Sequence, residues 1–139
     1  MSGATVEDEN SSKKVQDVLR RRRHLILLAQ NQTGLQNIFK LISESYKSEN
    51  FYRYPRMDYD LLAKYGEGVI AASACLGGVY AGNFWENREE GDEAVLNAMR
   101  ETTRRMIAIF GDRWYGELQW NNVPEQHKLC LLYTSPSPR

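Results

Sequence analysis

The chain has 139 residues with 18 basic and 18 acidic side chains, and 42% of its residues are hydrophobic. This balance fits a globular domain with a core and lacks the basic excess of a free-standing nucleic-acid-binding domain. No run of 18 apolar residues and no signal-peptide pattern occurs, so we expect no membrane contact and a cytoplasmic location.

Residues 1–22 are polar and charge-rich, with an acidic cluster at residues 7–9 and four consecutive arginines at residues 20–23. Few apolar residues occur here, so we expect an exposed linker or a frayed helix. The arginines are suited to phosphate contacts, but such a run is also typical of a solvated approach to a buried strand. Both interpretations remain open at this point.

Residues 25–29 are apolar on both faces, which predicts a buried parallel strand. Thr33 is then a predicted N-cap for a helix over residues 34–46. The apolar residues of this helix follow a 3.6-residue period, which predicts one buried stripe. The stripe consists of Leu35, Ile38, Phe39, Ile42 and Tyr46.

Residues 51–56 form an aromatic and basic loop, which is suited either to stacking on bases or to ordinary packing. Asp58 is a predicted cap of a short helix that ends at Gly66. A second buried strand is expected over residues 69–74. Further elements are expected as helices over residues 79–85 and 92–110 and a strand over residues 114–120.

This order of elements predicts an α/β fold with mainly parallel strands. Three strands cannot close a barrel, so we expect a sector of one. Phosphate-binding glycine loops, GxSxG, CxxC and HExxH patterns are all missing from the sequence.

Three residues before position 130 are soft metal ligands, namely His24, Cys75 and His127. Cys75 follows the second predicted strand, and functional groups in α/β sheets gather at the carboxyl ends of strands. His24 begins the first strand and does not fit this rule. A single cysteine or histidine is also a common structural residue, so both interpretations remain open from spacing alone.

Residues 130–139 differ sharply in composition from the residues before them. They match, residue by residue, one reading frame of a transposase-type sequencing adapter, so we expect adapter read-through rather than natural protein. The natural sequence would then continue beyond residue 129 in a longer protein.

Four blocks carry a family resemblance: residues 31–43, 51–58, 68–78 and 110–119. In this order and spacing they resemble the bacterial DNA polymerase III alpha-subunit family. The similarity covers residues 23–129 and lies in that family's N-terminal PHP (polymerase and histidinol phosphatase) domain. It implies a partial PHP domain, a sector of a distorted (β/α) barrel with a metal cluster at its mouth.

The resemblance also implies functional roles. His24 and Cys75 correspond to metal-site residues of the family, so we expect both to bind a zinc or manganese ion. The full-length parent would be a replicative DNA-directed DNA polymerase, bacterial or phage, that uses DNA, deoxynucleoside triphosphates and magnesium. The PHP site would support 3′-5′ exonuclease or phosphoesterase chemistry, or the domain would dock the proofreading exonuclease among other replisome subunits.

Other ligand motifs of the family, among them the opening His-x-His, and all polymerase carboxylates are missing from the sequence. No catalytic residue is therefore expected within the chain, and we expect the isolated chain to be inactive. A stand-alone PHP phosphoesterase acting on a small phosphate ester is the alternative.

Overall fold

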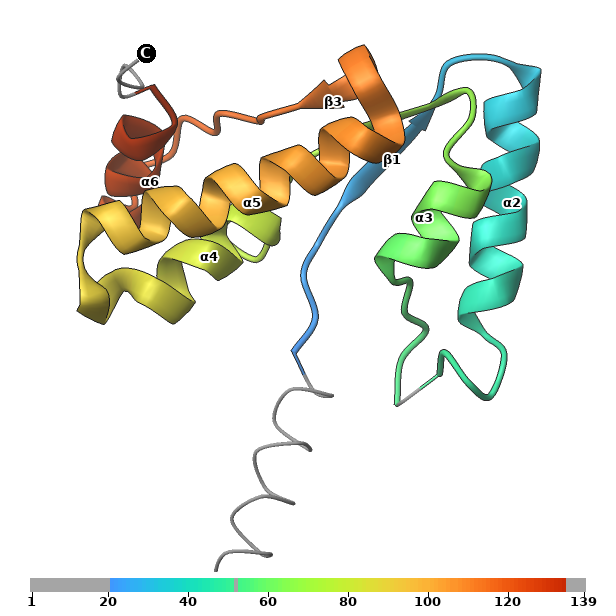
Figure 1. Cartoon of the computed structure of the whole chain (residues 1–139), viewed down its shortest axis with the longest axis horizontal. Coiled ribbons are helices and arrows are strands. Elements are labelled where there is room, and N and C mark those ends of the chain that lie inside the picture. Colours follow the sequence, from blue (N-terminus) through green and yellow to red (C-terminus); the bar gives the residue numbers. More distant parts are fainter. Residues whose placement is uncertain (1–20, 52, 135–139) are drawn as a thin grey trace, which may run out of the picture.

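The computed structural model describes residues 21–51 and 53–134, so the predicted linker lies almost wholly outside the described residues. Figure 1 shows two helix pairs, α2 with α3 and α4 with α5, beside a short three-stranded sheet. In these residues no helix is both long and apolar enough to cross a membrane. The elements are β1 (Ile26–Ala29), α2 (Gln32–Ser45), α3 (Tyr59–Tyr65), β2 (Val69–Ala72), α4 (Val79–Asn87), α5 (Asp92–Phe110), β3 (Trp114–Tyr115) and α6 (Pro124–Thr134), with single 3-10 turns at Arg88–Glu90 and Gly111–Arg113.

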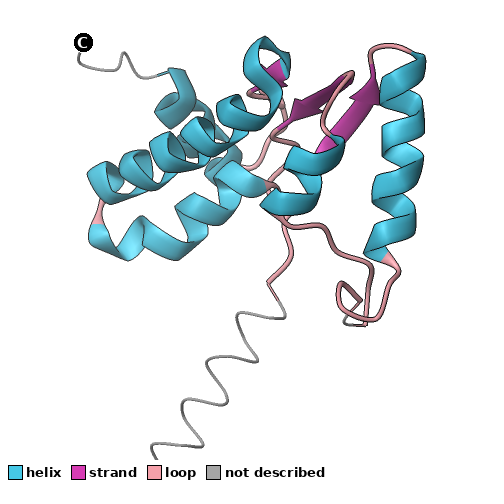
Figure 2. Cartoon of the chain, turned by 45° about the vertical axis from the view of Figure 1, so that its right-hand side comes forward, coloured by secondary structure: helices cyan, strands magenta, loops and turns pink. Residues whose placement is uncertain are grey.

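The sheet has the order β1-β2-β3 and mixed strand directions (Figure 2). β2 and β3 are parallel, as predicted, but β1 and β2 are antiparallel, with Ile26 opposite Ala72 and Ala29 opposite Val69. The prediction of mainly parallel strands is therefore wrong for the first pair. The α/β class itself is confirmed.

Helix lengths explain the two strand directions. After β1, the chain runs out along the 14 residues of α2 and returns through a loop and α3 to the point where it left the sheet. The N–H of Gln30 accordingly donates to the carbonyl oxygen of Gly68 at 2.9 Å. After β2, α5 is ten residues longer than α4, with 19 residues against nine. Ten helical residues rise about 15 Å, about the length of a four-residue strand, so α5 returns the chain to the start of β2.

The helices cover one face of the sheet. Side chains from α2, α3, β2 and α5 form one core cluster, which contains Leu41, Leu62, Val69, Ala71, Met106 and Phe110. Leu25 and Leu27 pack against it from the first strand segment. A second cluster joins α4, α5 and α6, and it contains Tyr80, Ala81, Phe84, Val95, Met99, Leu129 and Leu132.

The opposite face of the sheet, which we call the open face, carries the alternate residues of the strands. It consists of Ile26, Leu28, Ile70, Ala72 and Tyr115. None of these residues belongs to either core cluster, and Leu28 and Tyr115 are 54% and 55% exposed. Within the described residues the helices lie on one side of the sheet, and the barrel sector stays a prediction.

Helix α2 differs from its prediction in its cap and in its buried side. Asn31, not Thr33, is the N-cap, and its side chain accepts the N–H of Gly34 at 2.9 Å. The predicted buried stripe is largely exposed, with Phe39 at 58% and Tyr46 at 62%. The buried side instead consists of Gly34, Asn37, Leu41 and Ser45.

Close backbone contact sets this orientation of α2. A Cβ atom on Gly34 would lie 1.8 Å from the carbonyl oxygen of Gly68, so only glycine permits the approach. One turn later, Asn37 donates to the carbonyl oxygen of Glu67 at 2.9 Å. These two contacts turn the glycine and asparagine side toward the sheet and most of the apolar stripe away from it, and of the stripe Ile38 packs against the core cluster.

The remaining helix predictions are close to the structure. The predicted helix over residues 92–110 is α5, Asp58 caps α3, and α4 runs two residues beyond the predicted end. The third strand is shorter than predicted and ends at Tyr115. Helix α6 crosses the boundary at residue 130, and Leu132 packs in the same cluster as Leu129. The adapter origin of residues 130–139 stays a prediction, which sequencing of adapter-free DNA tests.

Candidate metal centre

The antiparallel pairing of β1 and β2 brings His24 and Cys75 together. The start of β1 lies beside the end of β2, so the residue before one strand meets the turn after the other. The Nδ1 atom of His24 lies 3.4 Å from the Sγ atom of Cys75, across 51 residues of sequence. His24 therefore belongs to the same edge of the sheet as Cys75, and the apparent conflict with its position at a strand start disappears.

Backbone contacts hold this edge. The N–H of His24 donates to the carbonyl oxygen of Gly77 at 2.8 Å, and the N–H of Gly78 donates to that of Cys75 at 2.7 Å. A Cβ atom on Gly77 would lie 3.0 Å from Nδ1 of His24, so the imidazole lies directly against the turn. The N–H of Gly77 also points at the Cys75 sulfur, at 3.4 Å.

Ala74 turns the chain between β2 and the cysteine. Its φ of +60° lies in the left-handed region, which costs a non-glycine residue about 1–2 kcal/mol. The surrounding turn enforces this conformation, since Ser73 before it is fully buried and bonded to β3. The strain thus accompanies the placement of Cys75 beside His24.

Glu117 is a further carboxylate at this edge that the sequence analysis did not single out. Its N–H donates to Oγ of Ser73 at 2.9 Å, and the N–H of Ser73 donates to the carbonyl oxygen of Tyr115 at 3.0 Å. The carboxylate accepts a hydrogen bond from Gln119 at 2.8 Å. The predicted strand over residues 114–120 placed Glu117 inside a strand, so the early end of β3 at Tyr115 hid this position from the sequence.

The His24 and Cys75 pair fits two adjacent ligands of one metal ion. Zn–N and Zn–S bonds of about 2.0 and 2.3 Å at a tetrahedral angle place the two ligand atoms about 3.5 Å apart, close to the observed separation. His24 is exposed and Cys75 is half-buried, so an ion can reach both. Within residues 21–51 and 53–134, no group of three or more His, Cys, Asp or Glu side chains is placed to hold a metal ion.

His127 is not part of this pair. It lies on α6, where its Nε2 atom is 3.0 Å from the carbonyl oxygen of Asn121 and its ring is near Trp120, with the ring centroids 5.9 Å apart. These contacts of His127 are all local, within seven residues of it along the chain.

Comparison with known proteins identifies the family of this chain. Residues 3–121 match the PHP domain family. The chain belongs to the PHP domain family. Its α/β sheet with helices on one face agrees with that membership, and the predicted resemblance is confirmed.

The most similar proteins found include DNA polymerase III subunit alpha from several bacteria. This PHP chain is 48% identical over 103 residues to the Aquifex aeolicus protein, covering 74% of the chain and 8% of that protein. It is 40% identical over 106 residues to the Thermus aquaticus protein, and this match covers 76% of the chain and 8% of that protein. The Chlamydia trachomatis protein is 30% identical over 138 residues, and this match covers 88% of the chain and 11% of that protein. The PHP chain thus spans about a tenth of the length of these relatives.

Proposed function

We propose that this chain is part of the PHP domain of a replicative DNA polymerase III alpha subunit, and that His24 and Cys75 are ligands of its divalent metal site. The similarity to relatives of that name over about three quarters of the chain supports the first part. The single observation that carries the second part is the 3.4 Å separation between the imidazole nitrogen and the thiol sulfur.

Of the two expected ions, zinc fits the imidazole and thiol of this edge better than manganese, which prefers oxygen ligands. His24 would bind through its neutral imidazole, and Cys75 through its deprotonated sulfur, which a bound metal favours. When bound, such an ion polarises phosphoryl oxygens and lowers the pKa of a bound water, which is the chemistry of phosphodiester hydrolysis. The Gly77 N–H orients the sulfur, and the bond from His24 to the Gly77 carbonyl oxygen fixes the imidazole side of the pair.

In the full-length protein, this domain would stand beside a DNA-directed DNA polymerase active site with its own magnesium ions. Its substrates would be DNA and deoxynucleoside triphosphates, and its partners would be replisome subunits in the cytoplasm. We expect the isolated chain to hydrolyse no phosphodiester, since two side chains do not form a catalytic metal site.

Two functions of the PHP site are compatible with this proposal. One is a 3′-5′ exonuclease or phosphoesterase, which the His24 and Cys75 pair favours. The other is a docking surface for the proofreading exonuclease, which the exposed apolar residues Phe39 and Tyr46 of α2 favour. A stand-alone phosphoesterase remains the alternative, and a reading frame that ends soon after the PHP domain would establish it.

Metal analysis of the full-length protein tests the proposal. His24→Ala and Cys75→Ala should each lower the bound zinc or manganese per protein and lower phosphodiesterase activity on a single-stranded oligonucleotide. His127→Ala is the matched control and should change neither quantity. Unchanged metal content and activity in both site variants would show that neither residue is a ligand. Lost metal content with unchanged exonuclease activity would assign the site a structural role.

A further inference from the structure

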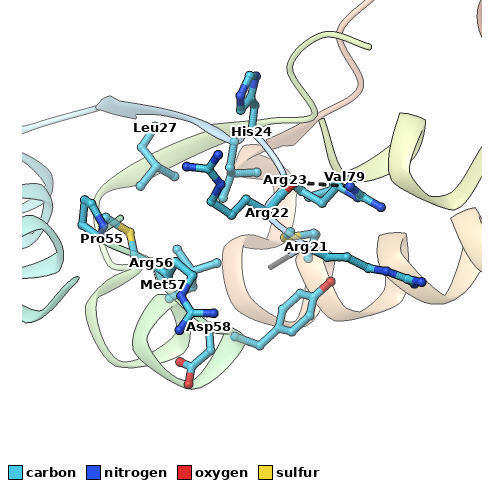
Figure 3. A pocket seen from close by; sticks show the side chains of 14 residues that line it. Arg21, Arg22, Arg23, His24, Leu27, Pro55, Arg56, Met57, Asp58 and Val79 are labelled. Carbon is cyan, nitrogen blue, oxygen red and sulfur yellow. Dashed lines mark hydrogen bonds between the residues drawn. The ribbon is translucent and has the colours of Figure 1, made fainter. Parts of the chain in front are cut away.

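A pocket of about 550 Å³ lies beside β1 on the face of the sheet that the helices cover (Figure 3). It joins two segments that the sequence analysis treated separately, the arginine run before β1 and the aromatic and basic loop before α3. Four arginines line it, namely Arg21, Arg22, Arg23 and Arg56. Among the described lining residues the one carboxylate is Asp58, and it already accepts the N–H of Leu61 at 2.9 Å as the cap of α3.

Two of these arginines are held by a weak ionic contact. Arg23 pairs with Glu86 of α4, and Arg21 lies 3.5 Å from the same carboxylate. The Arg23 side chain is 32% exposed, that of Arg21 is 55% exposed and that of Glu86 is 38% exposed. Exposed ion pairs contribute only about 0–1 kcal/mol, so an incoming anion can replace Glu86 at little cost.

Arg22 is placed by an aromatic ring rather than by a carboxylate. Its guanidinium lies over the ring of Tyr54, 3.7 Å from the centroid. This contact positions the side chain without neutralising its charge. Tyr54 is itself 52% exposed, so an aromatic surface and a positive charge meet at the pocket rim.

The floor of the pocket is apolar. It consists of Leu25, Leu27, Leu62, Val79 and Met106, all from the core cluster or packed against it. Proteins hold single strands by combining positive charge for the phosphates with aromatic side chains for the bases, and Arg22 over Tyr54 supplies both beside this pocket. Arginine in addition forms bidentate bonds to phosphate.

We propose that this pocket, which we call the arginine pocket, binds a single-stranded nucleic acid through its phosphates. Arg22 and Arg56 contact phosphate oxygens, and the adjoining nucleoside covers the apolar floor. His24 of the metal pair also lines the arginine pocket, but its ring points away from the Arg56 side chain (Figure 3). The proposed phosphate contacts use the Arg22 and Arg56 side chains and neither ligand of the metal pair, so nucleic-acid binding and metal binding can each fail without the other.

Residue-resolved protection in the full-length protein tests the arginine pocket. Phenylglyoxal modifies accessible arginines, and peptide mass spectrometry reports each rate. At about ten times its Kd, a short single-stranded oligodeoxynucleotide should slow modification of Arg22 and Arg56 roughly tenfold by mass action. Arg104, an exposed arginine of α5 paired with Glu101, is the internal control and should not change.

Two other anions, tested in place of the oligonucleotide, show which kind of ligand protects the two arginines. Inorganic phosphate at the same phosphate concentration should protect the two arginines much less than the oligonucleotide does. Equal protection by phosphate would identify a free-phosphate site, and equal protection by polyglutamate would identify a surface for acidic proteins. Either result, or no protection by the oligonucleotide, would overturn the proposal.

Photo-cross-linking supplies an independent measurement. A bromodeoxyuridine oligonucleotide should cross-link to Tyr54, and the yield should fall in the double variant Arg22→Ala, Arg56→Ala. The matched variant Arg104→Ala, Arg105→Ala removes the same charge from α5 and should leave the yield unchanged. Equal losses in both variants would indicate general electrostatic attraction and would contradict a defined pocket.

Discussion

The backbone N–H of His24 donates to the carbonyl oxygen of Gly77 at 2.8 Å, joining the residue before β1 to the turn after β2. The frame of the candidate metal centre is thus made by main-chain atoms. Replacing the imidazole of His24 or the thiol of Cys75 leaves this hydrogen bond in place. Variants of the two side chains therefore report on their chemistry rather than on the fold of the edge.

The cap of α2 gives a first stability prediction. Asn31→Ala removes the side-chain acceptor of the Gly34 N–H and should lower the free energy of unfolding by about 1 kcal/mol. Thr33→Ala, inside the first turn, should change it by less than about 0.5 kcal/mol. Chemical denaturation measures both values. A larger loss in the threonine variant would show that the cap is assigned to the wrong residue.

The contact between α2 and the start of β2 gives a second prediction. Gly34→Ala places a methyl group on the carbonyl oxygen of Gly68 and should destabilise the protein by about 2–3 kcal/mol. Gly116→Ala is the control, because its nearest neighbour is a side-chain atom of Tyr80 at 3.8 Å. It should change the stability by less than about 1 kcal/mol. Equal effects of the two substitutions in thermal unfolding would contradict the close approach of α2.

The strained turn before Cys75 gives a third prediction. Ala74→Gly relieves the left-handed backbone but loses a buried methyl group, so the two effects should offset to within about 0.5 kcal/mol. Ala71→Gly, at a fully buried alanine in β2, loses the methyl group without any relief and should cost about 1 kcal/mol or more. Denaturation curves compare the two variants. A cost at residue 74 as large as that at residue 71 would argue against strain in the turn.

Glu101 on α5 gives a prediction about pH. The pKa of Glu101 is lowered, first by a hydrogen bond from Arg105 and further by one from Arg104. A carboxyl group with a lowered pKa stabilises the folded state above its unfolded pKa, and this contribution is lost as the pH falls through the folded pKa.

Arg105→Gln should therefore raise the pKa of Glu101 toward its ordinary value, which carboxyl NMR titration measures. Arg100→Gln is the control, because Arg100 pairs with Glu93 instead, at 3.0 Å. An unchanged titration midpoint in the Arg105 variant would show that this arginine is not the cause.

Local patterns predicted the helices well. The apolar period over residues 92–110 and Gly111 after it determine α5, and Asp58 determines the start of α3, because both signals act within a few residues. The strand direction was not predictable in the same way. It depends on how far each helix pair carries the chain, and the pair α2 with α3 returns it for an antiparallel strand whereas α4 with α5 returns it for a parallel one.

The orientation of α2 shows a second limit. Its strongest apolar period, which includes Phe39 and Tyr46, is exposed in the described structure, whereas Gly34 and Asn37 face the sheet. Periodicity identifies an apolar stripe but cannot detect a backbone contact such as that between Gly34 and Gly68. The same antiparallel pairing that the sequence analysis missed places His24 beside Cys75, although both residues were already singled out.

X-ray absorption at the zinc edge tests the proposed metal centre most directly. In the zinc-loaded full-length protein, we predict one sulfur neighbour at about 2.3 Å and nitrogen or oxygen neighbours at about 2.0–2.1 Å. The sulfur shell should vanish in Cys75→Ala, and the imidazole scattering should weaken in His24→Ala. A spectrum without sulfur in the unmodified protein, or a sulfur shell that persists in Cys75→Ala, would contradict the assignment of Cys75 and His24 as ligands of one metal ion.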